Sequence, residues 1–212
     1  MEYIFDYKKS GVLGDIDGVI LLSKSPRRRE LLKFLDPIIM PVEIPERDIE
    51  KKFMDFYKDE DFLTRAAKTC SEISMAKSDL ALKSGTLYIS SDTMVIHEGK
   101  IYNKPRDMDE ARKMFYSYFG KSHFVVTSVC LRTLDYLDVF YSISKIDFVD
   151  LYDELKEPIE AYLASKTSLD KAGAYGIQDL DPRFVRSISG DINTIIGLPV
   201  AELSYRIFGK DK

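Results

Sequence analysis

Asp92 is the strongest candidate for a catalytic or metal-binding carboxylate in this chain. It lies among four consecutive polar residues, numbers 90–93, that interrupt a β-branched and aromatic strand expected over residues 86–96. Core packing alone does not explain a run of polar residues in a central strand. In an α/β sheet, residues at the carboxyl end of a strand project into the usual ligand crevice. The pattern therefore favours acid–base or metal chemistry at Asp92.

A second candidate element has the composition of an anion-binding helix start. Ser25 is a favourable N-cap, and Pro26 stands at the first helical position after a short apolar strand expected over residues 19–22. Backbone N–H groups at a helix N-terminus attract anions, and Arg27 and Arg28 add positive charge there. The alternative is a capped surface helix, although cations near a helix N-terminus oppose its dipole. The segment slightly favours a phosphate-binding element.

Three other charged residues have patterns that fit a solvated surface at least as well as a site. Glu46 lies in an acidic loop expected after a strand at residues 38–44; paired acids there could hold a cation, but acidic loops are usually solvated. Lys77 lies on a helix expected over residues 61–82, where a lysine ordinarily faces solvent. Lys104 precedes a proline, which holds it extended in what reads as an exposed turn.

Residues 170–178 have neither helical nor strand periodicity. Gly173 and Gly176 let the backbone approach another group closely or take a positive φ, and Gln178 offers a paired amide donor and acceptor. These properties suit a ligand-binding loop, whereas composition alone would favour a connecting loop with glycine turns.

The remaining segments alternate between helical and strand patterns. Two long strands expected over residues 124–133 and 137–149 form a hairpin, and a helix follows over residues 153–165. Helices between strands, together with a central hairpin, predict a mixed α/β fold with a twisted sheet flanked by helices. Residues 1–18 have no recognisable role and are treated as an N-terminal extension ahead of a single domain over residues 19–212.

Composition limits the classes of function. A chain of 212 residues with 45% hydrophobic residues can bury one substantial core, and a net charge of −4 argues against a dedicated nucleic-acid binder. Cys70 and Cys130 fit neither a metal-ligand spacing nor a disulfide framework. His97 and His123 are expected in turns or on a strand surface rather than as ligands. Without a long apolar segment or a leader pattern, we expect a soluble cytoplasmic protein that does not enter membranes.

Taken in order, these segments resemble the Maf family, also called septum formation inhibitor proteins, over residues 19–208. Six motifs carry the likeness: Ser23 Lys24 Ser25 Pro26 Arg27 Arg28 with Glu30 Leu31 Leu32; Ser91 Asp92 Thr93; Lys104 Pro105; Gly120 with Ser122 His123; residues 170–178; and Gly197 Leu198 Pro199. Six motifs in the family's order form a highly specific pattern. The resemblance implies a nucleoside triphosphate pyrophosphatase with an inosine-triphosphatase-like α/β fold, bilobed with a cleft.

The resemblance also implies roles for individual residues. Asp92 corresponds to the family's catalytic acid–base residue, and Glu46 is its expected catalytic partner; both would hold a divalent cation, Mg²⁺ or Mn²⁺. The expected substrate-binding residues are Ser23, Arg27, Arg28, Lys77, Lys104 and Gln178. The family's specificity positions fall on Arg27, Thr93 and Gln178.

Two branches of the family are distinguished by the residue after the aspartate and by the glycine-rich loop. Thr93 and the intact residues 172–178 resemble the branch that acts on dTTP and UTP, with CTP and modified pyrimidine nucleotides as further candidates. Leu22 and the pair Ser90 Ser91 depart from the small residue and the Gly-Ala that the family usually has. The implied partners are a nucleoside triphosphate and a second copy of the chain. The alternatives are a 7-methyl-GTP pyrophosphatase and a non-catalytic, nucleotide-binding regulator of septum formation.

Overall fold

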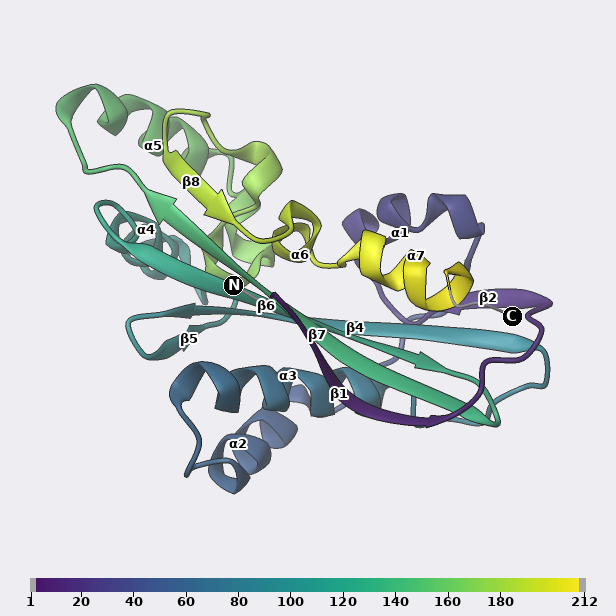
Figure 1. Cartoon of the computed structure of the whole chain (residues 1–212). Coiled ribbons are helices and arrows are strands. Elements are labelled where there is room, and N and C mark those ends of the chain that lie inside the picture. Colours follow the sequence, from purple (N-terminus) through teal and green to yellow (C-terminus); the bar gives the residue numbers. More distant parts are fainter. Residues whose placement is uncertain (1–2, 210–212) are drawn as a thin grey trace.

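The computed structural model describes residues 3–209, and its strands form one mixed sheet (Figure 1). In this part of the chain the sheet has eight strands: six follow the order β1-β7-β6-β4-β2-β3, while β5 pairs with β4 and β8 pairs with β7. The strands are β1 Ile4–Gly11, β2 Gly18–Leu21, β3 Ile38–Ile39, β4 Thr86–His97, β5 Lys100–Tyr102, β6 Ser122–Arg132, β7 Tyr136–Phe148 and β8 Val185–Ser189. Strand β2 is parallel to β3 and β4, and the other pairs are antiparallel.

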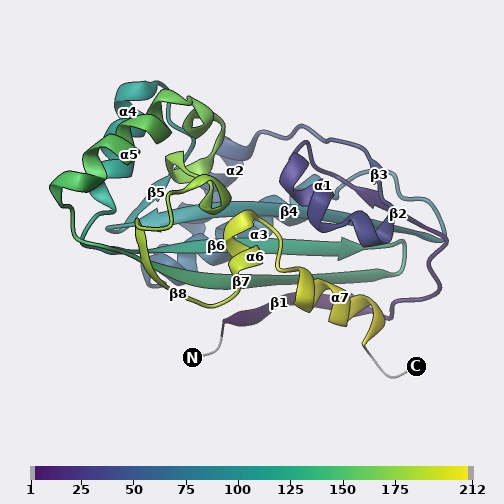
Figure 2. The same ribbon diagram turned by 90° about the horizontal axis from the view of Figure 1, so that it is seen from above.

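Helices cover both faces of the sheet, which confirms the mixed α/β fold predicted from the sequence. The α-helices are α1 Pro26–Leu31, α2 Glu46–Phe56, α3 Phe62–Lys77, α4 Met108–Ser117, α5 Lys156–Ala164, α6 Ile192–Ile196 and α7 Val200–Phe208. Helices α2 and α3 lie on one face, and α1, α6 and α7 lie on the other (Figures 1 and 2). Helices α4 and α5 gather with β8 at one end of the sheet (Figure 1). None of the helices within residues 3–209 is long and apolar enough to span a membrane.

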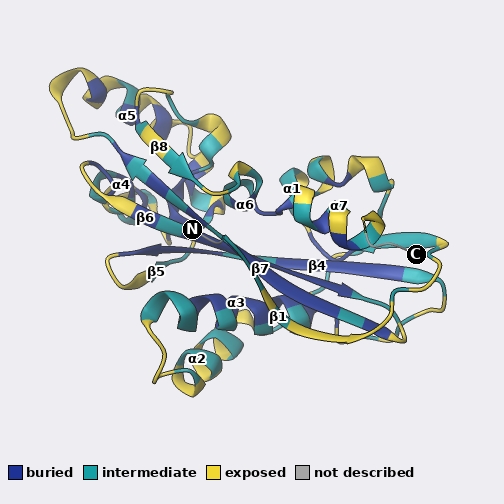
Figure 3. Ribbon diagram, in the orientation of Figure 1, coloured by how far each residue is buried: buried dark blue, intermediate teal, exposed yellow. Residues whose placement is uncertain are grey.

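The hydrophobic core has three parts, which correspond to these groups of helices. One cluster lies between α3 and the sheet, a second lies under α1 and α7, and a third, rich in aromatic rings, lies under α4 and α5. Figure 3 shows the central strands as the most continuously buried part of the molecule. Small residues of α3, such as Ala66, Ala67 and Cys70, are fully buried and let this helix approach the sheet closely.

Helix α1 begins as its sequence predicts. Ser25 is the N-cap, its hydroxyl accepts from the Arg28 N–H, and Pro26 occupies the first turn. Because cap and proline act locally, tertiary contacts are not needed to set this boundary.

Strand β4 has one edge that is only partly paired. Its pairing with β2 covers residues 86–89 and is followed by a last hydrogen bond from the Leu22 N–H to the Ile89 carbonyl, at 2.8 Å. Pairing with β5 begins only at Val95. Within the described residues, positions 90–94 therefore have a strand neighbour, β6, on one side alone. This stretch contains the four polar residues that the sequence singled out.

Three local expectations differ from the structure. Glu46 is the first residue of α2, with Pro45 at the N-cap, rather than part of an acidic loop, and the strand expected over residues 38–44 is reduced to Ile38 and Ile39. His97 and His123 are not surface residues: both are 1% exposed. They pack against aromatic side chains that other elements contribute.

The N-terminal extension contributes a strand to the sheet. Within residues 1–18, β1 pairs with β7 along one edge. Arg206 of α7 fastens this strand, since its Nη2 lies 2.6 Å from Asp6 Oδ1 and its Nη1 lies 2.7 Å from Oδ1 of the buried Asp138 on β7. The first strand and the last helix are thus joined through one guanidinium group.

Candidate active site

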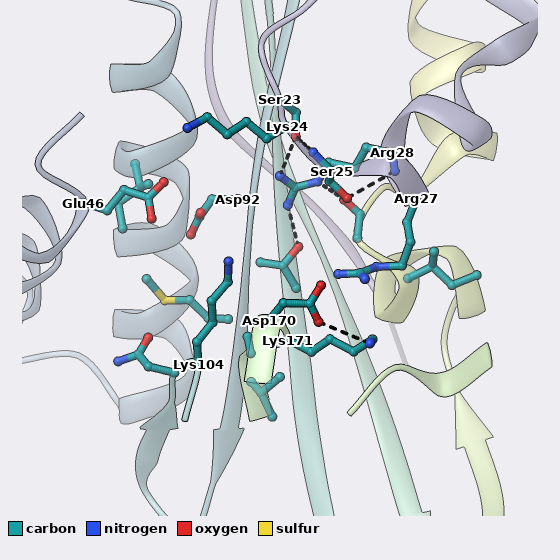
Figure 4. Close-up of a pocket in the computed structure, with 18 of the residues that line it drawn as sticks. Ser23, Lys24, Ser25, Arg27, Arg28, Glu46, Asp92, Lys104, Asp170 and Lys171 are labelled. Atoms are coloured by element: carbon teal, nitrogen blue, oxygen red, sulfur yellow. Dashed lines mark hydrogen bonds and ion pairs between the residues drawn. The ribbon is translucent and has the colours of Figure 1, made fainter. Parts of the chain in front are cut away.

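A cleft of about 600 Å³ follows the open stretch of β4. Its volume lies within the range of typical small-molecule sites. Segments far apart in the sequence form its wall, including the starts of α1 and α2, the loop after β5 and the loop before β8. All the residues singled out in the sequence line this cleft: Ser23, Arg27, Arg28, Glu46, Lys77, Asp92, Thr93, Lys104 and Gln178. Figure 4 shows how several of them converge.

Lys77 joins the two candidate catalytic carboxylates. Its Nζ donates to Asp92 Oδ1 at 2.8 Å and lies 2.9 Å from Glu46 Oε1. Burial alone would lower the pKa of the Lys77 ammonium, but the charges of Asp92 and Glu46 outweigh burial and raise that pKa. Lys77 therefore stays charged, and its exposed fraction of 7% contradicts the solvent-facing position that its helix pattern alone suggested.

The second oxygen of Asp92 faces a thiol. Cys70 Sγ lies 3.6 Å from Asp92 Oδ2, so that the thiol donates weakly to the carboxylate. Burial, followed by the charge of Asp92, raises the pKa of Cys70 well above its usual value, which keeps the thiol protonated. Asp92 is thus held between Lys77 and Cys70, both on α3.

The opposite face of β4 has a different set of contacts, centred on Arg28. Its Nη2 donates to Thr93 Oγ1 at 2.9 Å, and its Nε donates to the Gly197 carbonyl at 2.8 Å. Its Nη1 donates to the Ser91 carbonyl at 2.8 Å and makes a longer contact of 3.5 Å with Ser23 Oγ. Most of the donor capacity of Arg28 is therefore used by protein oxygens, and the side chain braces the wall of the cleft.

The open edge of β4 receives cations from both faces of the sheet. The Ser91 carbonyl accepts from Arg28 Nη1 and also from Lys77 Nζ, the latter at 3.4 Å. These two side chains come from α1 and α3, which lie on opposite sides of the sheet (Figure 1). The cleft therefore straddles a strand edge and is reached by groups from both sides.

Two further cations point into the cleft. Arg27 extends from α1, and Lys104 extends from the loop after β5 (Figure 4). Neither makes a hydrogen bond or an ion pair with any residue between 3 and 209. Two uncompensated cations facing one cavity suit an anionic ligand, in particular one with several phosphate oxygens. By contrast, Lys24 at the rim is paired with Glu43.

The glycine-containing loop, residues 170–178, is fixed from behind by aromatic side chains. Gly173 has φ +69°, and its carbonyl accepts from the Tyr118 hydroxyl at 2.9 Å. The Gly173 N–H donates to the Asn103 carbonyl at 3.2 Å, next to Lys104. A hydrogen bond of 2.6 Å joins the Tyr175 hydroxyl to His123 Nε2. This anchoring leaves the exposed Gln178 at the rim of the cleft.

Burial keeps the histidine behind this loop neutral. Burial, followed by the proximity of His97, lowers the pKa of His123 to about 3. The rings of the two histidines are 6.1 Å apart and nearly perpendicular. His123 therefore supports the loop as a neutral hydrogen-bonding group and lies outside the cleft lining.

The donor set fits a divalent cation supported by substrate oxygens. Asp92 and Glu46 direct one carboxylate oxygen each at a single cationic nitrogen, and such hard oxygen donors are those that Mg²⁺ and Mn²⁺ prefer. Within residues 3–209 no group of three or more His, Cys, Asp or Glu side chains converges as a metal site. Two protein ligands are typical of magnesium sites completed by phosphate and water.

Sequence reasoning overlooked two residues of the site. Cys70 precedes Lys77 by seven positions, so both lie on the same face of α3, and this spacing could have shown that Cys70 also faces Asp92. Lys171 was not singled out: its Nζ donates to the Thr167 carbonyl at 2.5 Å, and the residue is 6% exposed at the cleft wall. No sequence signal distinguishes it from an ordinary loop lysine.

Comparison with known proteins agrees with this arrangement. The family described as "Maf-like protein" matches residues 18–207. A Pyrococcus furiosus protein named dTTP/UTP pyrophosphatase is 40% identical over 185 residues, covering 86% of this chain and 90% of the relative. Proteins of the same name from Thermotoga maritima and Bacillus cereus are each 35% identical, covering 91% and 87% of this chain and 89% and 91% of the relatives. On the strength of this match along nearly its whole length, the chain belongs to the Maf family.

Proposed function

We propose that this protein hydrolyses the α–β phosphoanhydride bond of dTTP and UTP in the cleft along β4. The observation that carries the proposal is the convergence of Arg27 and Lys104, neither of which has a partner among residues 3–209, on a cleft that also holds the Asp92–Lys77–Glu46 group. Two such cations suit a polyphosphate, and a partly buried carboxylate beside them suits the activation of water. The choice of dTTP and UTP as substrates is taken from the names of the relatives.

In the proposed reaction a water oxygen bonds to the α-phosphorus while the bond from this phosphorus to the bridging oxygen breaks. Pyrophosphate leaves, and the nucleoside monophosphate remains. Asp92 orients the water and accepts its proton, while Lys77 and Cys70 hold the carboxylate in place. Arg27 and Lys104 compensate the negative charge of the phosphates, since phosphoryl transfer depends chiefly on positioning and charge stabilisation.

A divalent cation, Mg²⁺ or Mn²⁺, is part of this proposal. Held by Asp92 and Glu46, it would supply charge neutralisation on the phosphate oxygens. Lys77 lies between these carboxylates, so its ammonium would have to withdraw from one of them to admit the ion. Lys77 then remains available to a phosphate oxygen in the same cleft.

The remaining site residues are proposed to bind the nucleoside and to brace the site. Ser23 lies beside Arg28 at the start of α1, where its hydroxyl also accepts from the Ser25 N–H at 3.2 Å. Thr93 and Gln178 lie on separate walls of the cleft and, with Arg27, are the proposed specificity residues. A hydroxyl and a carboxamide can match the polar edge of a uracil or thymine base.

The cellular setting is proposed on the same basis. We propose a cytoplasmic enzyme acting as a homodimer on free nucleotides and not on nucleic acid, in a house-cleaning role connected with arrest of cell division. Residues 19–212 would form its single catalytic domain, and residues 1–18 would complete the sheet edge through β1.

The direct test is pyrophosphate release from a panel of nucleotides. Purified protein is incubated with Mg²⁺ or Mn²⁺ and dTTP, UTP, CTP or 7-methyl-GTP, and pyrophosphate is quantified. The expected result is fastest release from dTTP and UTP, abolished by a chelator. Faster turnover of 7-methyl-GTP would assign the protein to the other branch. Nucleotide binding without any release would indicate a non-catalytic regulator.

A further inference from the structure

A chain of hydroxyl groups leads from the cleft into the interior behind Thr93. Thr93 Oγ1 accepts from Arg28 Nη2 at 2.9 Å and lies 2.9 Å from Thr127 Oγ1. Thr127 is the partner of Thr93 in the register of β4 and β6, and its own hydroxyl donates to the Thr194 carbonyl of α6 at 2.7 Å. Thr127 and Thr194 are fully buried, and neither lines the cleft.

The direction of each hydrogen bond in this chain follows from counting protons. A hydroxyl has one hydrogen and two acceptor lone pairs, whereas a carbonyl only accepts and a guanidinium only donates. The hydrogen of Thr127 is committed to the Thr194 carbonyl, so Thr127 can only accept from Thr93. The hydrogen of Thr93 is then committed to Thr127, and one of its lone pairs is occupied by Arg28. One lone pair of Thr93 is left for a ligand.

We propose that Thr127 is a specificity-determining positioning residue: it fixes Thr93 as a pure hydrogen-bond acceptor toward the base. This inference rests on the proposed function. Thymine and uracil carry a hydrogen on ring nitrogen N3, which an acceptor matches, whereas N3 of cytosine carries only a lone pair. A fixed acceptor facing cytosine would leave two lone pairs opposed, and buried polar groups without partners are penalised strongly.

The selectivity resides in the network behind Thr93 as well as in Thr93 itself. A threonine hydroxyl without such a network can rotate to donate or to accept a hydrogen bond, so it would pair with the edges of thymine and cytosine equally well. Thr127 removes that freedom because its only hydrogen is already used. Arg28 occupies one of the two lone pairs of Thr93, so a single acceptor position is left for the ligand.

The test compares kcat/KM for dTTP and dCTP in three variants. Thr127→Val removes the acceptor for the Thr93 hydrogen, and we expect the preference for dTTP over dCTP to fall about tenfold. Thr127→Ser retains the hydroxyl and should retain the preference. Thr194→Val is the matched control: it removes a buried hydroxyl that donates to Ser142 Oγ but leaves the main-chain carbonyl that Thr127 uses, so the preference should not change.

Substrate analogues give a second measurement that needs no variant. Wild-type protein should lose at least tenfold in kcat/KM when dTTP is replaced by N3-methyl-dTTP, which has no N3 hydrogen. An unchanged preference in folded Thr127→Val, equal turnover of N3-methyl-dTTP, or equal wild-type turnover of dTTP and dCTP would each overturn the inference. All three can occur in an active pyrophosphatase. Failure to release pyrophosphate from any nucleotide would instead overturn the proposed function.

Discussion

Asp92 and Thr93 are adjacent in β4 but make contacts on opposite faces of the sheet. Asp92 meets Lys77 and Cys70 of α3, whereas Thr93 meets Arg28 of α1 and Thr127 of β6. Successive side chains of a strand point to opposite faces, so one dipeptide supplies the proposed base on one side and a proposed specificity residue on the other. Both can reach one ligand because this stretch of strand edge is open.

Replacing Asp92 by asparagine should remove most of the activity without unfolding the protein. The amide keeps the shape of the side chain but cannot accept the proton of the attacking water, so kcat for dTTP should fall roughly a hundredfold or more. Pyrophosphate release is the measurement, and circular dichroism checks the fold. Asp59→Asn, at an exposed residue away from the cleft, is the control and should retain full activity. Near-wild-type turnover of Asp92→Asn would remove Asp92 from the chemistry.

Replacing Lys77 by methionine should strengthen metal binding while weakening catalysis. The ammonium lies 2.8 and 2.9 Å from the two carboxylates, and its loss leaves their negative charges uncompensated. We expect the affinity for Mn²⁺, measured by titration calorimetry without nucleotide, to rise about tenfold. Turnover of dTTP should fall because Asp92 loses its strongest hydrogen bond. The control is Lys113→Met, on the exposed face of α4, which should change neither the Mn²⁺ affinity nor the turnover. An unchanged Mn²⁺ affinity in Lys77→Met would mean that Lys77 does not compete with the metal.

Two glycines with nearly the same positive φ allow the cost of backbone strain to be measured apart from the cost of a steric clash. Gly173 and Gly99 have φ values of +69° and +68°, so alanine at either costs about 1 kcal/mol of stability through its conformation. A Cβ at Gly173 would also lie 2.6 Å from the Tyr118 hydroxyl and 2.9 Å from Val95 Cγ1, whereas one at Gly99 meets nothing within 4 Å. Urea denaturation should therefore show a larger loss for Gly173→Ala. Its KM for dTTP should rise as well, because the shifted loop carries Gln178. Equal losses of stability in the two variants would show that the loop moves aside for the added Cβ at Gly173 without a further cost.

The buried His123 should make stability depend on pH in the acidic range. Its pKa is about 6.5 in an unfolded chain and about 3 in the folded protein, so between these values only the unfolded state takes up the proton. The free energy of unfolding should therefore fall as the pH falls from 7 to 5, with about 2 kcal/mol of the decrease due to this residue. In His123→Gln the decrease should be smaller by that amount, as measured by urea denaturation at both pH values. An identical decrease would mean that His123 is protonated in the folded state.

Features encoded by neighbouring residues could be predicted from the sequence. Ser25 and Pro26 define the start of α1 by local capping, which is independent of the rest of the fold. Asp92 stood out because polar residues interrupt an otherwise apolar strand, a pattern that is local as well. Lys77 and Lys104 were different: their own segments favoured surface positions, and only the resemblance to the Maf family indicated the site.

Features created by tertiary packing could not be predicted in this way. His97 and His123 stand beside polar turn residues, which made them look exposed; their burial depends on rings such as Tyr118 and Tyr175 that arrive from other elements. The contact of Cys70 with Asp92 likewise requires the docking of α3 against β4. The residues that position the site are therefore harder to predict than the residues that face it.

The open edge of β4 has a consequence for how this protein behaves at high concentration. Unpaired strand edges can recruit a strand from another molecule, which is a common route to aggregation. Here the Ser91 carbonyl is already taken by Arg28 and Lys77, and a charged carboxylate follows it directly. Burying these charges under an added strand would be costly. The charged side chains that are proposed to bind the nucleotide thus also oppose the addition of a strand from another molecule. Replacing them by neutral residues would therefore promote aggregation as well as abolish activity.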